Sequence, residues 1–262
     1  MEPKILFFDI ETAPIRAWVW GLFKQNIAVG QIDQDWYMLC YAAKWLGSDE
    51  IIYDAIWHDK KTFKKDPSND YQVVSTIWDL LDEADIVVAH NADRFDVNKV
   101  RAKFYEYGFE PPSPFKVVDT LKVSRANFGH STHRLDHIAN KRNLGRKLKT
   151  DFDLWLDCMS GNKDQQDKMI EYNIHDVELL EDVYLEMRPW VTNHPNYGVY
   201  TDGDQTVCPK CGSVDLHHRG YAYTTAGKFR RIKCNNCGGW SRYASNELDI
   251  SSRRRLARNV AK

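Results

Sequence analysis

The order of apolar stretches along the chain constrains its fold more than any other feature of the sequence. Three of these stretches predict consecutive strands with no helix between them, over residues 4–10, 37–45 and 51–57. Helices and short buried strands are then expected to alternate, over 71–83, 85–89, 93–107, 115–119, 134–142 and 164–187. This order predicts an α/β fold in which a mixed sheet is flanked by helices.

The 262 residues allow one large domain and a smaller module. Residues 194–207 contain Pro195, Gly198 and Gly203 and are predicted to form a linker. We therefore expect a main domain over 1–193, a cysteine-containing module over 208–245, and a basic tail over 246–262. The polar, Lys-rich residues 59–70 are expected to form a loop.

Charge divides the chain into an acidic and a basic part. Residues 208–262 contain 12 Lys and Arg against three acids, a net of +9, whereas residues 1–207 contain 24 basic and 34 acidic residues, a net of −10. A basic module on an acidic body predicts a phosphate-bearing partner. A solvated tail without a partner is the alternative.

Four of the six cysteines form two Cys-x2-Cys pairs, Cys208 with Cys211 and Cys234 with Cys237. Two such pairs can point four thiolates at one ion, so they predict a structural Zn²⁺ site of the zinc-ribbon type. Two disulfides are the alternative, although nothing else in the sequence indicates an oxidising compartment.

Between the two cysteine pairs, residues 218–223 and 228–233 are predicted to form a hairpin. Basic and aromatic side chains interleave along it: Arg219, Tyr221, Tyr223, Lys228, Phe229, Arg230, Arg231 and Lys233. This mixture is typical of surfaces that bind single-stranded nucleic acid. A ribbon that only fixes the C-terminus or docks a protein is the alternative.

Acidic residues stand at the end of the first predicted strand. Asp9 and Glu11 are two residues apart, so their carboxylates emerge on the same face. Charges at the end of a buried strand need compensation, and a divalent cation can supply it. The alternative is that Glu11 begins the next loop and Asp9 caps another element.

Two later segments also place polar groups near the body of the domain. Asp96 lies at the start of a predicted helix, in the pattern Asn91-x3-Phe95-Asp96; taken alone, it fits ordinary charge complementation at a helix N-terminus. Tyr172 and Asp176 are four residues apart on the last helix. They share a face with apolar positions and are expected to point inward.

Together, these three segments resemble the motifs of the DEDD 3′–5′ exonucleases of the ribonuclease-H-like superfamily, in the same order. A tyrosine four residues before the last Asp resembles the tyrosine subgroup, as in proofreading domains of family B DNA polymerases. Glu171 stands where the histidine subgroup carries its histidine, and His175 does not fit that role. The resemblance covers about residues 4–187 and is to stand-alone nucleases of the phage and bacterial type.

The resemblance implies a set of site residues and metals. Two Mg²⁺ or Mn²⁺ ions, about 4 Å apart, would be held by four carboxylates: Asp9, Glu11, Asp96 and Asp176. It also implies that Tyr172 hydrogen-bonds the attacking water or the scissile phosphate. Thr12 and Asn91 would hold the terminal nucleotide, and the product would be a nucleoside 5′-monophosphate.

The sequence thus predicts a metal-dependent 3′–5′ exonuclease that acts on DNA, with single strands or 3′ ends as partners. The same chemistry on RNA stays open, because no reader of a 2′-hydroxyl is evident. A structure-selective endonuclease also stays open. A non-catalytic nucleic-acid adaptor is a further alternative, but it gains nothing from clustered like charges. No apolar run approaches about 18 residues, and charge near the N-terminus opposes a signal peptide, so we expect no membrane span and a cytoplasmic location.

An aromatic-rich connection is expected over residues 11–35. Trp18, Trp20 and Phe23 occur there within six residues, directly after the acidic strand. In this position they could stack on the terminal base or wedge a duplex end. The alternative is a loop packed on the edge of the sheet.

Overall fold

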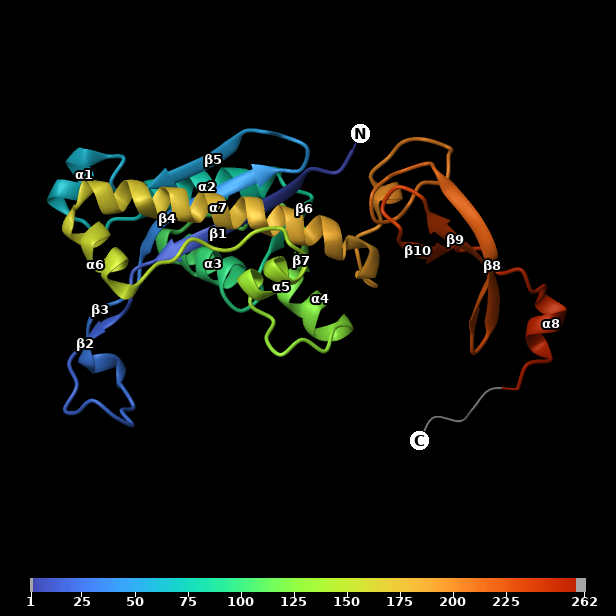
Figure 1. The fold of residues 1–262 in the computed structure, drawn as a ribbon, viewed down its shortest axis with the longest axis horizontal. Helices are drawn as coiled ribbons and strands as arrows, with labels where there is room; N and C mark the ends of the chain where they lie inside the picture. The colour runs from blue at the N-terminus through green and yellow to red at the C-terminus, as the bar shows by residue number, and fades with distance from the viewer. Residues whose placement is uncertain (1, 258–262) are drawn as a thin grey trace. The chain divides into compact units, whose positions relative to one another are not determined.

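The computed structural model describes residues 2–257 and contains a five-stranded mixed sheet flanked by helices (Figure 1). The strand order is β5-β4-β1-β6-β7, with bounds β1 (Ile5–Thr12), β4 (Met38–Trp45), β5 (Ile51–Ala55), β6 (Ile86–Ala89) and β7 (Lys116–Asp119). Strand β1 pairs antiparallel with β4 and parallel with β6, so the two halves of the sheet meet along it. The predicted α/β fold is confirmed.

Helices cover both faces of β1. Leu6, Phe8 and Ile10 lie in the core that α2 (Tyr71–Glu83) and α3 (Asp96–Tyr107) complete. On the other face, the ring of Phe7 lies 5.3 Å from that of Tyr184 in α7 (Lys163–Met187). Figure 1 shows α7 in front of the sheet, with α2 and α3 behind it. Because side chains alternate along a strand, Asp9 and Glu11 share the face of Phe7, under α7.

Between β5 and α7, three short helices lie where the sequence pattern did not predict them. They are α1 (Lys60–Lys65), inside the expected loop, α4 (Thr120–Asn127) and α6 (Phe152–Ser160). Each is capped by an aspartate whose carboxylate accepts first-turn N–H groups: Asp59, Asp119 and Asp151. Helices this short display too few apolar positions for periodicity to be visible, so the cap residue was the main signal.

Two other helices differ from the prediction only at their bounds. Helix α3 begins at Asp96 rather than at residue 93, and it ends at Gly108, whose φ of +74° is the left-handed conformation that glycine favours. Helix α5 spans Leu135–Lys141. Within residues 2–257, no helix is both long and apolar enough to cross a membrane.

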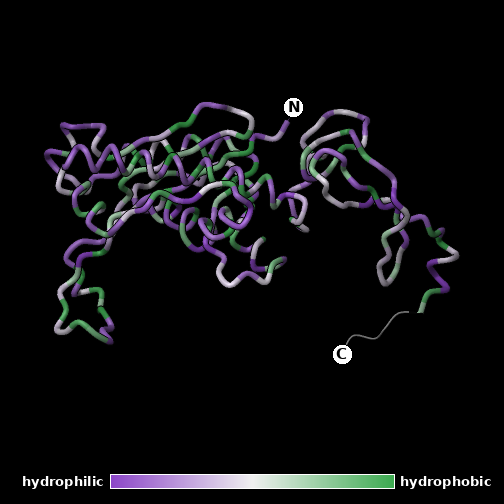
Figure 2. Tube along the Cα trace, viewed as in Figure 1, coloured by the Kyte–Doolittle hydropathy of each residue, from purple (hydrophilic) through white to green (hydrophobic). Residues whose placement is uncertain are grey.

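The connection after β1 is partly ordered as a hairpin. Strand β2 (Arg16–Ala17) pairs with β3 (Ile32–Gln34), and a 3-10 turn, η1 (Val29–Gln31), precedes β3. We call residues 13–35 the aromatic hairpin. Figure 2 shows apolar stretches in this hairpin, outside the strands of the sheet. Trp18, Trp20 and Phe23 are all exposed, so the alternative of a loop packed on the sheet edge is wrong.

Contacts within the chain define two compact units. One is Lys4–Tyr184, which holds the sheet; the other contains, of the described residues, 2–3 and 185–257. The predicted bounds of the domains, the linker and the ribbon stay predictions.

The second unit is built around a small antiparallel sheet with the order β10-β9-β8. Its elements are the 3-10 helices η2 (Arg188–Trp190) and η3 (Tyr197–Val199), the strands β8 (Leu216–Thr224), β9 (Gly227–Cys234) and β10 (Trp240–Arg242), and helix α8 (Ile250–Arg254). Pairing of β8 with β9 confirms the predicted hairpin. Of the predicted basic tail, residues 258–262 lie outside the described part of the chain.

Candidate active site

Three carboxylates from two elements converge on one face of the sheet. Asp9 and Glu11 of β1 and Asp176 of α7 each offer an oxygen, and these oxygens lie within 4.8 Å of one another. Glu11 is still inside the strand, paired with Cys40 of β4, so it does not begin a loop. The three acids therefore meet because alternate residues of β1 share one face of the sheet, and because Asp176 lies on the side of α7 that faces this sheet.

Asp96 lies next to this cluster, at the first residue of α3. Its side chain is 1% exposed, and its Oδ1 accepts the N–H of Ile10 at 3.4 Å. Ile10 stands between Asp9 and Glu11 in β1, so Asp96 borders the same strand. The structure thus groups three of the four predicted carboxylates within 4.8 Å and places the fourth beside them.

Burial and mutual repulsion raise the pKa of these carboxyl groups. Burial, followed by the charge of Asp176, raises the pKa of Asp9 to about 7. Burial, followed by the charge of Asp9, raises the pKa of Glu11 and that of Asp96 well above the usual range. Buried like charges destabilise a fold unless a cation or protons compensate them.

Among residues 2–257, one oxygen of Asp176 has no hydrogen-bond partner. Its Oδ2 lies 2.5 Å from Nζ of Lys147, whereas its Oδ1 is buried and accepts no hydrogen bond. An unpaired buried carboxylate oxygen beside two further carboxylates suits a hard divalent cation such as Mg²⁺ or Mn²⁺. The donor set therefore fits the predicted metals.

Two side chains that sequence reasoning missed orient the carboxylates. Nδ2 of Asn173 donates to Oδ2 of Asp9 at 2.8 Å, and Nε1 of Trp155 donates to Oε2 of Glu11 at 3.2 Å. Asn173 lies three residues before Asp176 in α7, so the helical period could have predicted that its side chain points inward. Trp155 lies in α6, a helix that the periodicity did not reveal.

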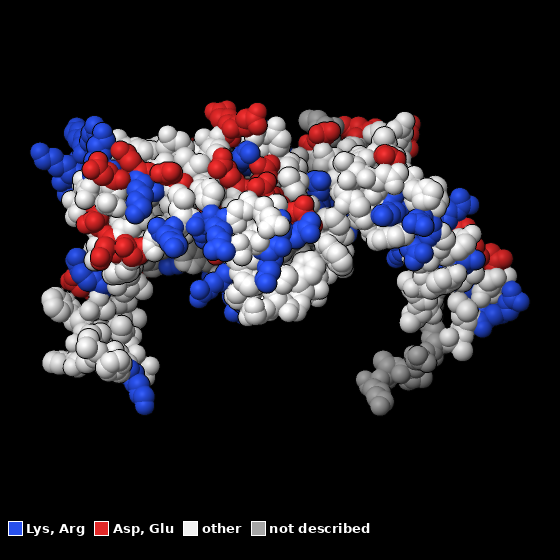
Figure 3. All heavy atoms as spheres, viewed as in Figure 1, with Lys and Arg blue, Asp and Glu red and all other residues white. Residues whose placement is uncertain are grey.

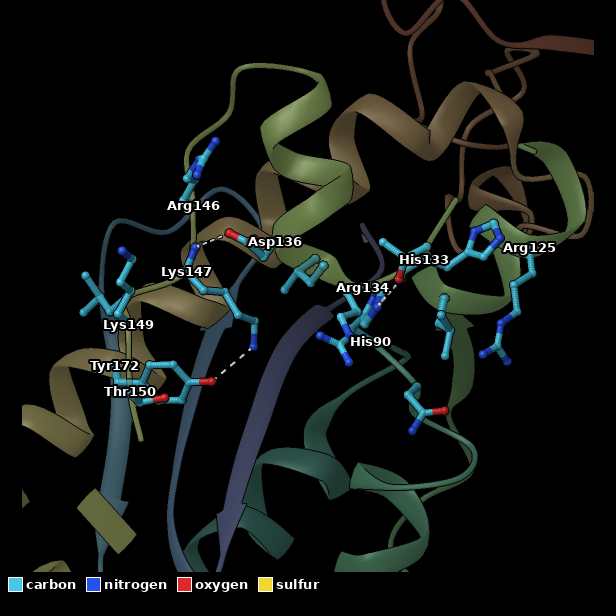
Figure 4. A pocket seen from close by; sticks show the side chains of 15 residues that line it. His90, Arg125, His133, Arg134, Asp136, Arg146, Lys147, Lys149, Thr150 and Tyr172 are labelled. Carbon is cyan, nitrogen blue, oxygen red and sulfur yellow. Dashed lines mark hydrogen bonds between the residues drawn. The ribbon is translucent and has the colours of Figure 1, made fainter. Parts of the chain in front are cut away.

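Lys147 was also missed, and it reaches the cluster from an irregular segment between α5 and α6. The backbone N–H of Lys147 donates to Oδ1 of Asp136 at 2.9 Å (Figure 4). The carbonyl of Arg146 lies 2.7 Å from Nε2 of His175. Burial lowers the pKa of Lys147, but the charges of Asp176 and Asp9 outweigh it and raise this pKa overall. Lys147 therefore stays a cation, and no pattern in residues 142–151 could have placed it here.

Tyr172 is buried, and its hydroxyl lies 3.3 Å from Nζ of Lys147. Burial, followed by the charge of Asp176, raises the pKa of Tyr172. The hydroxyl thus keeps its proton near neutral pH and can donate a hydrogen bond. Figure 4 shows the side chains of Tyr172 and Lys147 pointing toward each other.

The two residues predicted to hold a nucleotide lie at strand ends. Thr12 is the last residue of β1. Asn91 follows β6 with a φ of +80°, a conformation that is uncommon for any residue other than glycine. Its N–H donates to Oδ1 of Asp119 at 3.0 Å, which helps to hold this conformation.

A pocket of about 1000 Å³ opens beside Tyr172 and Lys147, and Asn91 lines it (Figure 4). Five cationic side chains line it: Arg125, Arg134, Arg146, Lys147 and Lys149. Among the described lining residues Asp136 is the single acid, and its carboxylate already accepts the Lys147 N–H. Such a concentration of positive charge favours a phosphate-bearing ligand.

The second unit holds the four-cysteine cluster. The four sulfurs of Cys208, Cys211, Cys234 and Cys237 lie within 4.8 Å of one another, and none of these cysteines is in a disulfide. The sulfurs of Cys208 and Cys237 are 3.7 Å apart, and those of Cys211 and Cys234 are 3.6 Å apart. Four thiolates around one tetrahedral Zn²⁺ are separated by about 3.8 Å, because each Zn–S bond is about 2.3 Å long. The geometry fits zinc and contradicts the disulfide alternative.

Comparisons with known proteins agree with this arrangement. The sequence profile described as the RNase_H superfamily matches residues 6–188. Among solved structures, the chain is similar to the family B DNA polymerase from the hyperthermophilic archaeon Pyrobaculum calidifontis, with a TM-score of 0.51 and 14% identity. The match covers 71% of this chain and 25% of the polymerase chain, and at this identity it shows a common fold. A comparison with curated sequences finds no match.

Proposed function

The chain belongs to the RNase_H superfamily, and on that premise we propose that it is a metal-dependent 3′–5′ exonuclease of the DEDD tyrosine subgroup. It would shorten DNA from the 3′ end and release nucleoside 5′-monophosphates. The observation that carries the proposal is the convergence of Asp9, Glu11 and Asp176 within 4.8 Å, with a buried, unpaired oxygen on Asp176. Clustered carboxylates with raised pKa values are costly to the fold, and a cation-dependent reaction explains why they are there.

Two Mg²⁺ or Mn²⁺ ions would be held by four carboxylates: Asp9, Glu11, Asp96 and Asp176. When bound, such ions activate a water and balance the negative charge that builds up on the phosphate and the leaving oxygen. Asn173 would keep the Asp9 carboxylate in its orientation, and Trp155 would do the same for Glu11, through the hydrogen bonds described above.

Tyr172 and Lys147 would act on the scissile phosphate. Tyr172 keeps its proton, so its hydroxyl donates a hydrogen bond and does not serve as a base. The Lys147 ammonium lies 3.3 Å from that hydroxyl, so both donors point into the same space. In the metal-free chain Lys147 neutralises part of the charge on Asp176, and with substrate present it would bind a phosphate oxygen.

The cationic pocket would guide the strand to the site. Arg125, Arg134 and Lys149 line it and would bind backbone phosphates. Asn91 in the pocket wall and Thr12 at the end of β1 would hold the terminal nucleotide. The pocket therefore supports a nucleic-acid substrate on a body that otherwise carries net negative charge.

The zinc-ribbon unit would add affinity for the same substrate. The Arg231 guanidinium lies 4.9 Å from the ring centroid of Trp240, and that of Arg242 lies 3.7 Å from the ring centroid of Phe229. Alternating cations and aromatic rings are typical of surfaces that bind single strands. These cation–ring contacts support the proposal that the basic part of the chain binds nucleic acid.

The direct test compares three substrates in the presence of Mg²⁺: a 5′-end-labelled linear DNA strand, a circular DNA strand and a linear RNA strand. We expect stepwise shortening of the linear DNA with release of mononucleotides, an intact circle and slower loss of the RNA. A cut circle would indicate an endonuclease, and faster loss of RNA would indicate an RNA substrate. Binding without hydrolysis of any strand would indicate an adaptor.

A further inference from the structure

The aromatic hairpin exposes more apolar surface than a free loop is expected to. Trp18 is 74% exposed, Trp20 is 97% exposed and Phe23 is 83% exposed. Leu22 and Val29 lie in the same hairpin and are also largely exposed. A concentration of large exposed apolar side chains marks an interaction site. The hairpin is therefore a candidate binding surface.

Hydrogen bonds hold the hairpin in a defined conformation. Beyond the pairing of β2 with β3, the N–H of Trp18 donates to the carbonyl of Gln31 at 2.9 Å. The Gln31 side chain donates to the carbonyl of Trp18 and accepts the N–H of Ala28, each at 2.9 Å. The backbone on both sides of the hairpin tip is therefore ordered, so a ligand that binds there orders less of the chain than one that binds a fully flexible loop.

The base of the hairpin is fixed to the elements that carry the carboxylates. The hairpin continues directly from β1, and the N–H of Ala13 donates to the carbonyl of Tyr37 at 2.9 Å. Trp36, at the other end of the hairpin, lies under two cations of α3: Nζ of Lys99 is 3.6 Å from its ring centroid, and Nζ of Lys103 is 4.7 Å from it. Because α3 begins with Asp96, the hairpin has a fixed position relative to both β1 and α3.

The charge of the hairpin identifies the class of ligand. Residues 13–32 contain no acid and two cations, Arg16 and Lys24. Asp33 and Asp35 close the hairpin, and Asp33 pairs with Arg16, so the hairpin as a whole is neutral, whereas residues 1–207 carry a net charge of −10. In Figure 3 the hairpin is a mostly white projection with blue atoms at its end. A neutral hairpin on an acidic body, with its two acids at its base and Lys24 next to its exposed aromatic rings, is suited to a polyanion whose bases can stack.

We propose that the aromatic hairpin stacks on unpaired bases of the nucleic-acid substrate, with Trp18, Trp20 and Phe23 as the stacking side chains. This inference rests on the proposed function for its substrate class, and it assigns a binding surface outside the carboxylate cluster. Each stacked base improves Kd by about 5- to 150-fold. Stacking tolerates any sequence, because every base presents a π-face.

The test measures binding rather than hydrolysis. Single DNA strands of 12 nucleotides, each with 2-aminopurine at a different position, are titrated with the full chain in buffer without added Mg²⁺ or Mn²⁺, which prevents cleavage at the carboxylate cluster without removing zinc from the cysteines. We expect wild-type protein to quench the fluorescence at one or two positions. The variant Trp20→Leu/Phe23→Leu keeps the surface apolar but removes two rings, so it should lose the quenching and raise Kd at least tenfold.

Tyr105→Ala is the matched control, because Tyr105 is 89% exposed on α3 and lies outside the hairpin. It should behave as wild type in Kd and in quenching, and all three proteins should melt at the same temperature. Equal Kd and equal quenching in wild type and the double variant would overturn the inference. A wild-type dimer that the double variant converts to a monomer would also overturn it, in favour of a second copy of the chain.

The two proposals fail in different ways. A wild-type protein that quenches 2-aminopurine but hydrolyses no strand with Mg²⁺ contradicts the exonuclease and leaves the hairpin inference standing. A wild-type protein that hydrolyses DNA, with a double variant that binds equally well, contradicts the hairpin inference alone.

Discussion

Replacing Asp9 with asparagine should stabilise the metal-free protein. The substitution removes one charge from the carboxylate cluster, and the asparagine oxygen can still accept the hydrogen bond from Asn173. Burial and the charge of Asp176 raise the pKa of Asp9 from 3.8 to about 7. Keeping Asp9 ionised in the folded state therefore costs up to about 4 kcal/mol of unfolding free energy. For a chain of this size that corresponds to a rise in Tm of up to about 10 °C for Asp9→Asn.

The effect depends on pH in a direction that follows from the raised pKa. Between about pH 4 and pH 7 the folded state binds more protons at Asp9 than the unfolded state does, so the stability of the wild type falls as pH rises through this window. The advantage of Asp9→Asn should therefore be full at pH 8 and less than half as large at pH 5.

The assay is thermal unfolding in EDTA at pH 5 and pH 8, followed by the same measurement with Mg²⁺ at pH 8. Mg²⁺ should raise the Tm of the wild type and have little effect on Asp9→Asn. Asp49→Asn, at an exposed carboxylate in the turn before β5, serves as the control and should match wild type throughout. The reasoning is refuted if Asp9→Asn melts below wild type in EDTA at pH 8, or if its advantage is the same at both pH values.

Three further predictions concern the other parts of the site. Lys147→Met should lower kcat at least tenfold and lower Tm in EDTA, because it removes the cation nearest Asp176. Lys149→Met, in the same pocket, should raise KM without lowering Tm. Equal effects of the two substitutions would contradict the assigned roles. Tyr172→Phe should reduce kcat less than the loss of a carboxylate does, since it removes a hydrogen bond rather than a ligand; complete loss of activity would indicate a larger role. Arg231→Gln/Lys233→Gln should weaken DNA binding, reduce the slope of log K against log salt by about 2, and leave kcat unchanged. An unchanged slope would indicate that the ribbon binds another partner.

Strand β1 and helix α7 could be predicted because each has a sequence pattern long enough to recognise. Asp9 and Glu11 follow a compact apolar run, and the two-residue period of a strand places both on one face. Asp176 lies in a helix of 25 residues whose inward face is marked by apolar positions. Their convergence followed from the order of motifs, and the structure groups the three carboxylates accordingly.

The residues that surround these carboxylates could not be predicted, for different physical reasons. Lys147 lies in a segment without regular structure, and it is placed by backbone contacts with Asp136 and His175 that no local pattern encodes. Trp155 lies in a helix of nine residues, where propensity and periodicity are both weak signals. The stem of the aromatic hairpin consists of strands of two and three residues, which are held by side-chain bonds of Gln31 as much as by strand pairing.

The central claim is that the carboxylate cluster performs hydrolysis, and the rate of the Asp176→Ala variant tests it most directly. The measurement is the rate at which a 5′-end-labelled DNA strand is shortened at saturating Mg²⁺ and substrate, with the Kd for the same strand measured in parallel. The account predicts a rate below about one hundredth of wild type with Kd within about threefold, since a metal ligand is lost while the cationic pocket is kept. A variant that keeps more than about one hundredth of the wild-type rate, at wild-type affinity, would contradict the assignment of this cluster as the catalytic metal site.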